Sequence, residues 1–543
     1  MDMKLMLGTG IGWRVAAWFC VGAIALGTLA GTATAAAGVS TAATHGNASA
    51  TPVVAVADGA VRGRAAGAVD EFLGIPYAAA PIGPLRWRAP QPAARWSGVR
   101  DATKFAPHCA QPATPFGLAS SSEDCLYLNV FAPADRKHRG DGHPVMVWIH
   151  GGGLSIGESD DYDPTKLAAD GTIVVTINYR LGALGFLAHP ALADRPGGSS
   201  GAYGLMDQQA ALRWVQRNIR EFGGDPRKVT IAGESAGGLS VLAHVASPRA
   251  HGLFARAIVQ SGAFLTQTPL KDAETAGEAF ATKAGCARQT AACLRGLPVS
   301  IILANDNPPL TGYVPGVVDG EVLTQSIGTS LASGQFNRVP IINGTNHDEA
   351  RLFTAVSELQ GAPVTAANYQ AMIASTVGVS ADVAAVIATQ YPVSGYPSPA
   401  VALGAVGTDA IFACPALTLD TWASKFVPTF AYEFNDDNAP QRYLPPVSFP
   451  YGAAHASELQ YLFDLPTAPI AGTLTAQQQR LATSMRHYWA HFAARGFPSS
   501  PGQPPWPTFN GHSRQMLSLI PPQPQIQTDF ATEHHCAFWA HTG

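Results

Sequence analysis

The stretch KVTIAGESAGGLSVL, residues 228–242, constrains the fold more than any other part of this chain. Residues 229–231 are a short, mostly β-branched run, which predicts a buried strand, and a small-residue segment with helical character begins after Ser235. The Gly-x-Ser-x-Gly pattern between them is typical of a tight turn, because glycines without a Cβ let strand and helix pass closely while the serine is exposed. Ser235 is therefore a candidate nucleophile. The N–H of Ala236, at the start of the helix, is a candidate donor to a developing negative charge.

The five-residue pattern alone is weak evidence, because 55 of the 543 residues are glycine. The pattern occurs a second time at residues 197–201, but Pro196 precedes that copy and no apolar strand leads into it. Residues 197–201 are therefore predicted to be a flexible loop. The flanking strand and helix, rather than the pattern itself, single out Ser235.

A second glycine-rich segment, His-Gly-Gly-Gly at residues 150–153, follows an apolar run at residues 144–149 that predicts a buried strand. Consecutive glycines let the backbone approach a ligand with its N–H groups exposed. Such donors can stabilise the oxyanion of acyl transfer, where loss of one donor costs about 10²–10³ in rate. The segment could also be an ordinary flexible loop, whereas a phosphate cradle is disfavoured because no Lys-Ser or Lys-Thr follows. Its position upstream of the serine turn favours an oxyanion hole.

Strand and helix patterns alternate along the chain, which predicts βαβ units, a mostly parallel sheet and an α/β fold. A hairpin and its continuation are predicted over residues 53–76. Residues 264–336 and 354–450 contain helical pieces and Pro/Gly loops with few strand patterns, so we expect insertions over the carboxyl ends of the strands, where α/β folds bind ligands. Further strands are expected at 126–131, 144–149, 172–178, 340–344 and 427–434, and helices at 205–219 and 476–494.

The composition favours a large folded core, since 47% of the residues are hydrophobic and 13% are charged. The length alone would suggest about three or four domains. Large α/β enzymes can form one continuous unit, however, and we expect residues 53–543 to be a single catalytic domain. The net charge of −4 and the lack of a long basic run give no reason to expect nucleic-acid binding.

The N-terminus has the pattern of an export signal. Lys4 and Arg14 flank the start of an apolar stretch at residues 15–29, and Ala-Thr-Ala at 33–35 offers small residues for cleavage. We expect residues 1–37 to be a signal peptide and 38–52 a flexible mature N-terminus, which predicts a periplasmic or secreted protein. An uncleaved membrane anchor is the alternative. No other segment is expected to be long and apolar enough to cross a bilayer.

Seven cysteines are present, and Cys20 lies within the expected signal, which leaves six in the exported part. An even number in an oxidising compartment favours disulfides, although six cysteines allow 15 pairings. Pairing of nearest neighbours is one of these. The run His534-His535-Cys536 could suggest a metal site, but no second Cys/His cluster has the spacing that tetrahedral zinc needs, so no metal is expected.

At this point the sequence resembles the type B carboxylesterases of the α/β-hydrolase fold, the group that includes the cholinesterases. The resemblance extends over residues 72–463 in the order of the family, with weaker matches in HYWAHFAARG and PPWPTF. The segments that carry it are FLGIPYAAAPIGPLRW, SEDCLYLNVFAP, WIHGGG, NYRLGALGF, GLMDQQAALRWVQRNIREFGGDP, VTIAGESAGG, VQSGAF, GTNHDEARLF and GAAHASELQYLF.

The resemblance implies a catalytic triad of Ser235 as nucleophile, Glu349 as acid and His455 as general base, in the chain order expected for this fold. The residues alone could not select Glu349 over Asp348, or His455 over the histidines that follow it. The implied oxyanion hole consists of Gly152, Gly153 and Ala236. An Arg86–Glu123 ion pair, buried polar support from Glu234, Ser261 and Glu458, and disulfides Cys109–Cys125, Cys286–Cys293 and Cys414–Cys536 are also implied.

The implied function is hydrolysis of a small-molecule carboxylic ester without a metal or cofactor, and the oligomeric state is left open. A lipase, an amidase and a non-catalytic adhesion or binding protein on the same scaffold are the alternatives. The segment between Cys109 and Glu123 is short and has no Trp, whereas cholinesterases place a choline-binding Trp there, so a quaternary-ammonium substrate is disfavoured. Ala202 stands where the family often has Asn.

Overall fold

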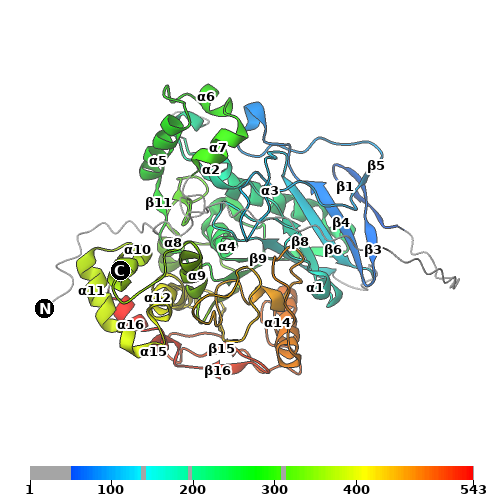
Figure 1. The fold of residues 1–543 in the computed structure, drawn as a ribbon. Coiled ribbons are helices and arrows are strands. Elements are labelled where there is room, and N and C mark those ends of the chain that lie inside the picture. Colours follow the sequence, from blue (N-terminus) through cyan, green and yellow to red (C-terminus); the bar gives the residue numbers. More distant parts are fainter. Residues whose placement is uncertain (1–50, 136–141, 194–197, 307–312, 542–543) are drawn as a thin grey trace, which may run out of the picture.

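The computed structural model describes residues 51–135, 142–193, 198–306 and 313–541 (Figure 1). The expected signal peptide, residues 1–37, and most of the expected flexible segment 38–52 lie outside the described residues.

The central element is a sheet of 11 strands in the order β16-β15-β14-β13-β10-β9-β7-β8-β6-β4-β3. Its middle is parallel from β8 to β15, and antiparallel pairs lie at both edges. A mostly parallel twisted sheet with helices on its faces is the α/β-hydrolase architecture that the sequence predicted. The strands are β3 (Arg64–Ala66), β4 (Val69–Pro76), β6 (Tyr127–Pro133), β7 (His143–Ile149), β8 (Ile173–Ile177), β9 (Gly224–Glu234), β10 (Arg256–Gln260), β13 (Ile341–Asn346), β14 (Thr429–Phe434), β15 (Met516–Leu519) and β16 (Gln525–Gln527).

Helices cover both faces of this sheet, because alternate side chains of each buried strand point to opposite sides. In β7, Val145 and Val147 belong to a core that includes side chains of α3 (Tyr203–Asn218) and α4 (Ala236–Ala246). Met146 and Trp148 belong to a second core with side chains of α14 (Ala476–Arg495). The strand is buried on both faces, which explains its continuous apolar sequence.

The predicted N-terminal hairpin forms, and residues 53–76 are divided between two sheets. β1 (Val53–Val56) and β2 (Gly59–Arg62) pair antiparallel in a separate three-stranded sheet with β5 (Val99–Asp101). The continuation, β3 and β4, enters the central sheet. Gly63 separates the two pieces, and a Cβ there would lie 2.3 Å from the carbonyl oxygen of Glu71.

Two helical segments interrupt the series of strands. The first follows β10 and contains α5 (Leu270–Lys283), α6 (Ala291–Arg295), α7 (Val299–Asn305) and α8 (Ile327–Ser333). The second follows β13 and contains α9 (Arg351–Leu359), α10 (Tyr369–Val377), α11 (Ala381–Gln390), α12 (Pro399–Gly407), a π-helical turn η7 (Thr408–Ala413) and α13 (Cys414–Ala423). These elements contribute to one hydrophobic core together with side chains of the C-terminal helices. β14 lies within the 354–450 range expected to be an insertion. Figure 1 shows α5–α7 at one end of the molecule, and α10–α12 beside the C-terminal helices α15 (Phe530–Glu533) and α16 (Cys536–Trp539).

One long helix corrects the expectation about membrane spans. Among the described residues, Pro399–Ala423 is long and apolar enough to cross a bilayer. Its most apolar 18-residue window is 83% buried inside the fold, however, as expected for a helix of a protein core.

The six described cysteines form the disulfides Cys109–Cys125, Cys286–Cys293 and Cys414–Cys536. These are the pairs that the resemblance implied. The third connects the start of α13 to the start of α16 and thereby fixes the C-terminal helices to the helical segment that follows β13.

Candidate active site

Several of the predicted site residues follow neighbouring parallel strands. Ile149 at the end of β7 pairs with Gly233 in β9, and Glu234 pairs with Gln260 at the end of β10. Gln260 in turn pairs with Gly344 in β13. The segments that follow these parallel strands therefore all begin at the carboxyl ends of the strands, on the side of the sheet where α/β folds bind their ligands.

Ser235 occupies the sharp turn between β9 and α4, with φ 56° and ψ −123°. A non-glycine residue at positive φ is unusual and marks a position that the surrounding fold imposes. Gly237 explains how the turn is possible, since a Cβ on it would lie 2.0 Å from the carbonyl oxygen of Ile149. The turn that the sequence predicted is thus present. The second copy of the pattern differs, because Ser199 lies in irregular backbone between η3 (Pro190–Leu192) and α3.

The glycine triplet after β7 lies beside this turn. Gly152 and Gly153 have φ values of 97° and 63°, and both line the same pocket as Ser235. A Cβ on Gly152 would lie 2.2 Å from the carbonyl oxygen of Ile156, so only glycine fits. Neither N–H donates a hydrogen bond within the described chain, and Ala236 begins α4, where backbone N–H groups have no partner inside the helix. These donors are available to a ligand.

The Glu349–His455 pair joins two distant loops. Nδ1 of His455 lies 2.5 Å from Oε2 of Glu349. The other carboxylate oxygen accepts hydrogen bonds from the N–H of Asn346, at 2.8 Å, and the hydroxyl of Thr345, at 2.7 Å. The backbone N–H of His455 also donates to the carbonyl oxygen of Glu349 at 3.2 Å. These bonds fix both the carboxylate and the imidazole in orientation.

Two aromatic rings enclose His455. Phe353 from α9 and Phe412 from η7 stack nearly parallel to each other, and the centroid of each lies 5.1 Å from that of the imidazole. Burial lowers the pKa of His455, but the carboxylates of Glu234 and Glu349 have the larger combined effect and raise it to about 9. The helical segment after β13 thus forms one wall of the site.

The second ring nitrogen of His455 faces Glu234 rather than Ser235. Nε2 of His455 lies 3.1 Å from Oε1 of Glu234. Burial raises the pKa of Glu234 to about 8, with a smaller opposing effect of the imidazole. In the described structure Ser235 Oγ makes no hydrogen bond, although Ser235 and His455 line one pocket. The hydrogen bond between nucleophile and base is commonly long in free enzymes and tightens in the complex.

The other implied polar residues lie nearby, with different degrees of contact. Glu458 accepts hydrogen bonds from Gln260 and Asn346, at 3.0 and 2.7 Å. Asn346 also donates its backbone N–H to Glu349, so it links the carboxylates of Glu458 and Glu349. Asn346 was not among the predicted site residues. Ser261 is buried directly after β10 with φ 51°, but its hydroxyl has no hydrogen-bond partner in the part of the chain that the structure describes.

The implied ion pair is present farther from the pocket. Arg86 donates two hydrogen bonds to Glu123, at 2.6 and 2.5 Å. The same guanidinium donates to the carbonyl oxygens of Arg295 and Leu297, which ties the loop after α6 to the body of the protein.

The pocket itself is mostly apolar and aromatic. Apart from the residues already described, its walls include Phe116, Phe264, Ile411, Leu352 and Tyr443. Asp161 also lines it, and burial raises the pKa of this carboxyl to about 8. Sequence reasoning missed these wall residues because they lie in loops and insertions that share no local pattern.

A strained serine turn after a parallel strand, facing backbone N–H donors and a carboxylate–imidazole pair, defines the α/β-hydrolase class. The Carboxylesterase family model matches residues 50–539. The chain is 37% identical to acylcarnitine hydrolase of Mus musculus, over 83% of both chains. It is 36% identical to cocaine esterase of Homo sapiens over 88% of both chains, and 36% identical to fumonisin B1 esterase of Sphingopyxis macrogoltabida over 83% of both. The solved structure of PNB esterase superposes with a TM-score of 0.76 at 32% identity, covering 89% of this chain and 98% of the other. The chain belongs to the carboxylesterase family and is a carboxylic ester hydrolase.

Proposed function

We propose that the protein hydrolyses small-molecule esters through an acyl-enzyme intermediate, with Ser235 as nucleophile, His455 as general base and Glu349 as the acid that orients the base. The observation that carries this proposal is the convergence of the strained Ser235 turn, the free N–H groups of the glycine triplet and the Glu349–His455 pair on one pocket.

In the first step, Ser235 Oγ attacks the ester carbonyl while Nε2 of His455 takes the hydroxyl proton. The carbonyl oxygen becomes an oxyanion, which accepts hydrogen bonds from the N–H groups of Gly152, Gly153 and Ala236. The carbon–oxygen bond to the alcohol then breaks, and His455 returns the proton to the leaving alkoxide. Water, deprotonated by the same imidazole, hydrolyses the acyl-enzyme and restores the serine.

Glu349 stabilises the imidazolium that forms in each half of the reaction. Its carboxylate already accepts two hydrogen bonds besides the one that it shares with His455, so it needs no reorientation during the reaction. No step requires a metal or cofactor.

The pocket walls favour esters with apolar groups. Phe116, Phe264, Phe353 and Phe412 line the pocket that contains the proposed nucleophile and base. Apolar contact with such rings is the main source of binding free energy in sites of this kind. Lipases and amidases of this fold use the same chemistry, and the shape of the pocket decides which substrates bind.

We also infer that the protein acts outside the cytoplasm. The pattern of residues 1–37 is that of a signal peptide, and the three disulfides are typical of an oxidising compartment. Protease protection in intact cells, with mass determination of the mature N-terminus, tests this inference.

The catalytic assignment is tested with p-nitrophenyl esters and a fluorophosphonate label. Ser235→Ala is expected to lower turnover by at least about 10⁴-fold and to abolish labelling, because the hydroxyl is the nucleophile. Ser199→Ala is the matched control, since Ser199 lies in the second Gly-x-Ser-x-Gly copy, and it should behave as the wild type. Turnover retained by Ser235→Ala would contradict the assignment, and a wild type that neither turns over nor reacts would indicate a non-catalytic binding protein.

A further inference from the structure

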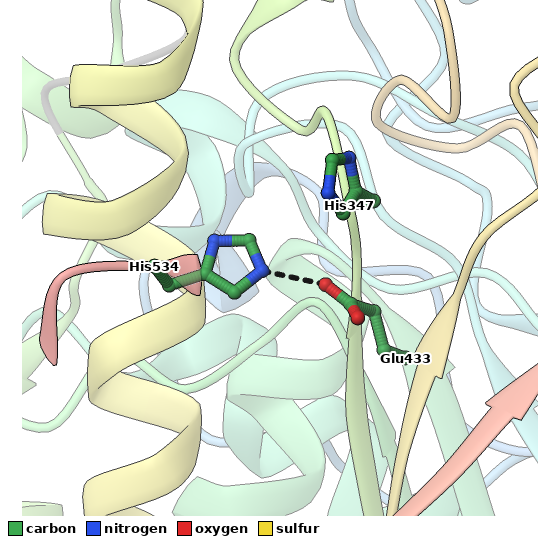
Figure 2. A group of neighbouring side chains, drawn as sticks. All are labelled: His347, Glu433 and His534. Atoms are coloured by element: carbon green, nitrogen blue, oxygen red, sulfur yellow. Dashed lines mark hydrogen bonds and ion pairs between the residues drawn. The ribbon is translucent and has the colours of Figure 1, made fainter. Parts of the chain in front are cut away.

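We propose that His347, Glu433 and His534 form a binding site for a divalent transition metal ion, with Zn²⁺ as the best match. Figure 2 shows the three side chains facing a common space. One potential ligand atom of each lies within 4.8 Å of the others. Two imidazoles and one carboxylate are ligands typical of zinc.

The backbone positions of the three residues are fixed by the sheet and the C-terminal helices. Glu433 lies in β14, and His347 directly follows the neighbouring parallel strand β13, with its N–H donating to the carbonyl oxygen of Phe434 at 3.0 Å. His534 directly follows α15, close to the Cys414–Cys536 disulfide. The site therefore joins three segments far apart in sequence.

His534 has the environment of a metal-ligating histidine. Its Nε2 lies 2.6 Å from Oε1 of Glu433, and its Nδ1 lies 2.6 Å from Oδ1 of Asp409. Asp409 also accepts a hydrogen bond from the hydroxyl of Tyr391 at 2.6 Å. A carboxylate behind the second ring nitrogen is the usual arrangement for such ligands, because it fixes the tautomer and the ring orientation.

Glu433 is held in the same way. Its side chain is fully buried, and Oε2 accepts hydrogen bonds from Gln527 at 2.7 Å and Asn435 at 3.0 Å. Oε1 has only His534 as its partner among the described residues. One oxygen is thus occupied by neutral donors, while the other faces the proposed site.

His347 completes the set from the more exposed side, where 29% of its side chain is accessible. Its Nε2 lies 3.1 Å from Glu533, and its Nδ1 lies 3.1 Å from Asp348 but makes no hydrogen bond. Whichever nitrogen turns to the metal, the other keeps a carboxylate partner. Partial exposure at this residue provides an entry path and room for a water ligand.

The adjustment that binding needs is small. Ligand atoms of a tetrahedral zinc ion, at about 2.0–2.1 Å from the metal, lie about 3.4 Å apart. The 2.6 Å contact between His534 and Glu433 must open by about 0.8 Å, and His347, whose ligand atom lies within 4.8 Å of the other two, must move inward by at most about 1.4 Å. His347 can move because its side chain is partly exposed. The shorter opening of the His534–Glu433 contact has to come from small side-chain rotations of these two buried residues.

The surrounding charge favours a cation. Four carboxylates, those of Asp348, Asp409, Glu433 and Glu533, contact the two imidazoles. Arg351 lies 2.8 Å from Asp348 and offsets part of this charge. Metal ligation requires neutral imidazoles, and a divalent ion would then offset most of the remaining negative charge. The alternative is a metal-free cluster in which protonated histidines bridge the carboxylates.

The experiment uses the full chain, stripped with a chelator, supplied with one equivalent of Zn²⁺ and separated from free metal by gel filtration. Elemental analysis is expected to find about one zinc per chain, and zinc is expected to raise the thermal unfolding midpoint. His347→Gln, which removes the least buried ligand, should lower zinc retention by at least about tenfold and abolish the thermal shift. His512→Gln is the matched control because His512 is an exposed histidine of a C-terminal turn.

Two results would overturn the proposal in favour of the metal-free cluster. One is a wild type that retains far less than one zinc per chain, and the other is equal zinc retention by the wild type and His347→Gln. If His347→Gln fails to fold, a Co²⁺ titration of the wild type still tests the proposal without the variant. Co²⁺ should bind with one-to-one saturation and the intense visible absorption of a tetrahedral site, and absence of that spectrum also contradicts the proposal.

Discussion

On one side of the pocket, Ser235, Gly152 and Gly153 are held by backbone geometry, whereas on the other side Glu349 and His455 are held by hydrogen bonds between distant segments. The first side depends on local conformation. Ser235 has a φ of 56°, and the strand, turn and helix can pack closely against one another because the glycines between them have no Cβ. The second depends on partners from the end of β13, from the two loops that carry Glu349 and His455, and from the helical walls α9 and η7. Substitutions on the two sides should therefore fail in different ways.

Apart from removal of the nucleophile itself, the largest effect is expected on the side held by side chains. Glu349→Gln should lower kcat by about 10⁴-fold with little change in KM, because the amide cannot stabilise the imidazolium and favours the wrong tautomer. Steady-state kinetics with a p-nitrophenyl ester provides the measurement. Asp348→Asn is the control, since Asp348 instead pairs with Arg351 and accepts the N–H of Ala453. It should lower stability and cost less than about tenfold in kcat; equal losses in both variants would refute the choice of Glu349.

A smaller effect is expected on the side held by backbone. Gly152→Ala should lower kcat/KM by about 10²–10³-fold, because a Cβ 2.2 Å from the carbonyl oxygen of Ile156 displaces the donor segment. Gly171→Ala separates this steric effect from conformational strain, since Gly171 also has φ 97° but faces open space. The control should lose stability without loss of activity per folded molecule. If both variants lose activity equally, strain rather than position of the donors is responsible.

The smallest effect concerns the contact between the two sides. Oε1 of Glu234 lies 3.1 Å from Nε2 of His455, and a proton on Nε2 must leave before this nitrogen can act as a base. Since the pKa of His455 is raised to about 9, kcat/KM of the wild type should rise between pH 7 and pH 9. Glu234→Gln removes one carboxylate, so the acid limb should move to lower pH by about one unit. A pH–rate profile tests this, and an unchanged limb would show that Glu234 does not raise the pKa of His455.

The same contrast explains what could be predicted from the sequence. β7, β9 and the Ser235 turn are encoded by contiguous residues, and their prediction needed only β-branched runs, glycine spacing and order. Glu349 and His455 have no such local pattern, because each lies in a loop beside other acids or ahead of other histidines. They could be selected only through resemblance to a family, and their catalytic roles stay predictions.

Other features could not be predicted because they depend on packing. β10, β15 and β16 were not predicted, since each is short and the sheet around it decides its conformation. The π-helical turn η7 places Phe412 against His455, yet its sequence reads as an ordinary apolar helix. No metal was predicted from the spacing around His534, because the other two members of the proposed cluster are far away in sequence: His347 directly follows β13, and Glu433 lies in β14.

The Cys414–Cys536 disulfide encloses a segment that carries His455, β14, β15 and the whole of α14, with a sequence separation of 122 residues. A single proteolytic cut inside this covalent loop would leave both fragments attached to one another. The proposed general base would then stay on the same particle as the nucleophile, and such a nicked enzyme would migrate as an intact chain until a reductant is added. That linkage makes cleavage of the backbone inside the loop and separation of the proposed catalytic residues two separate events.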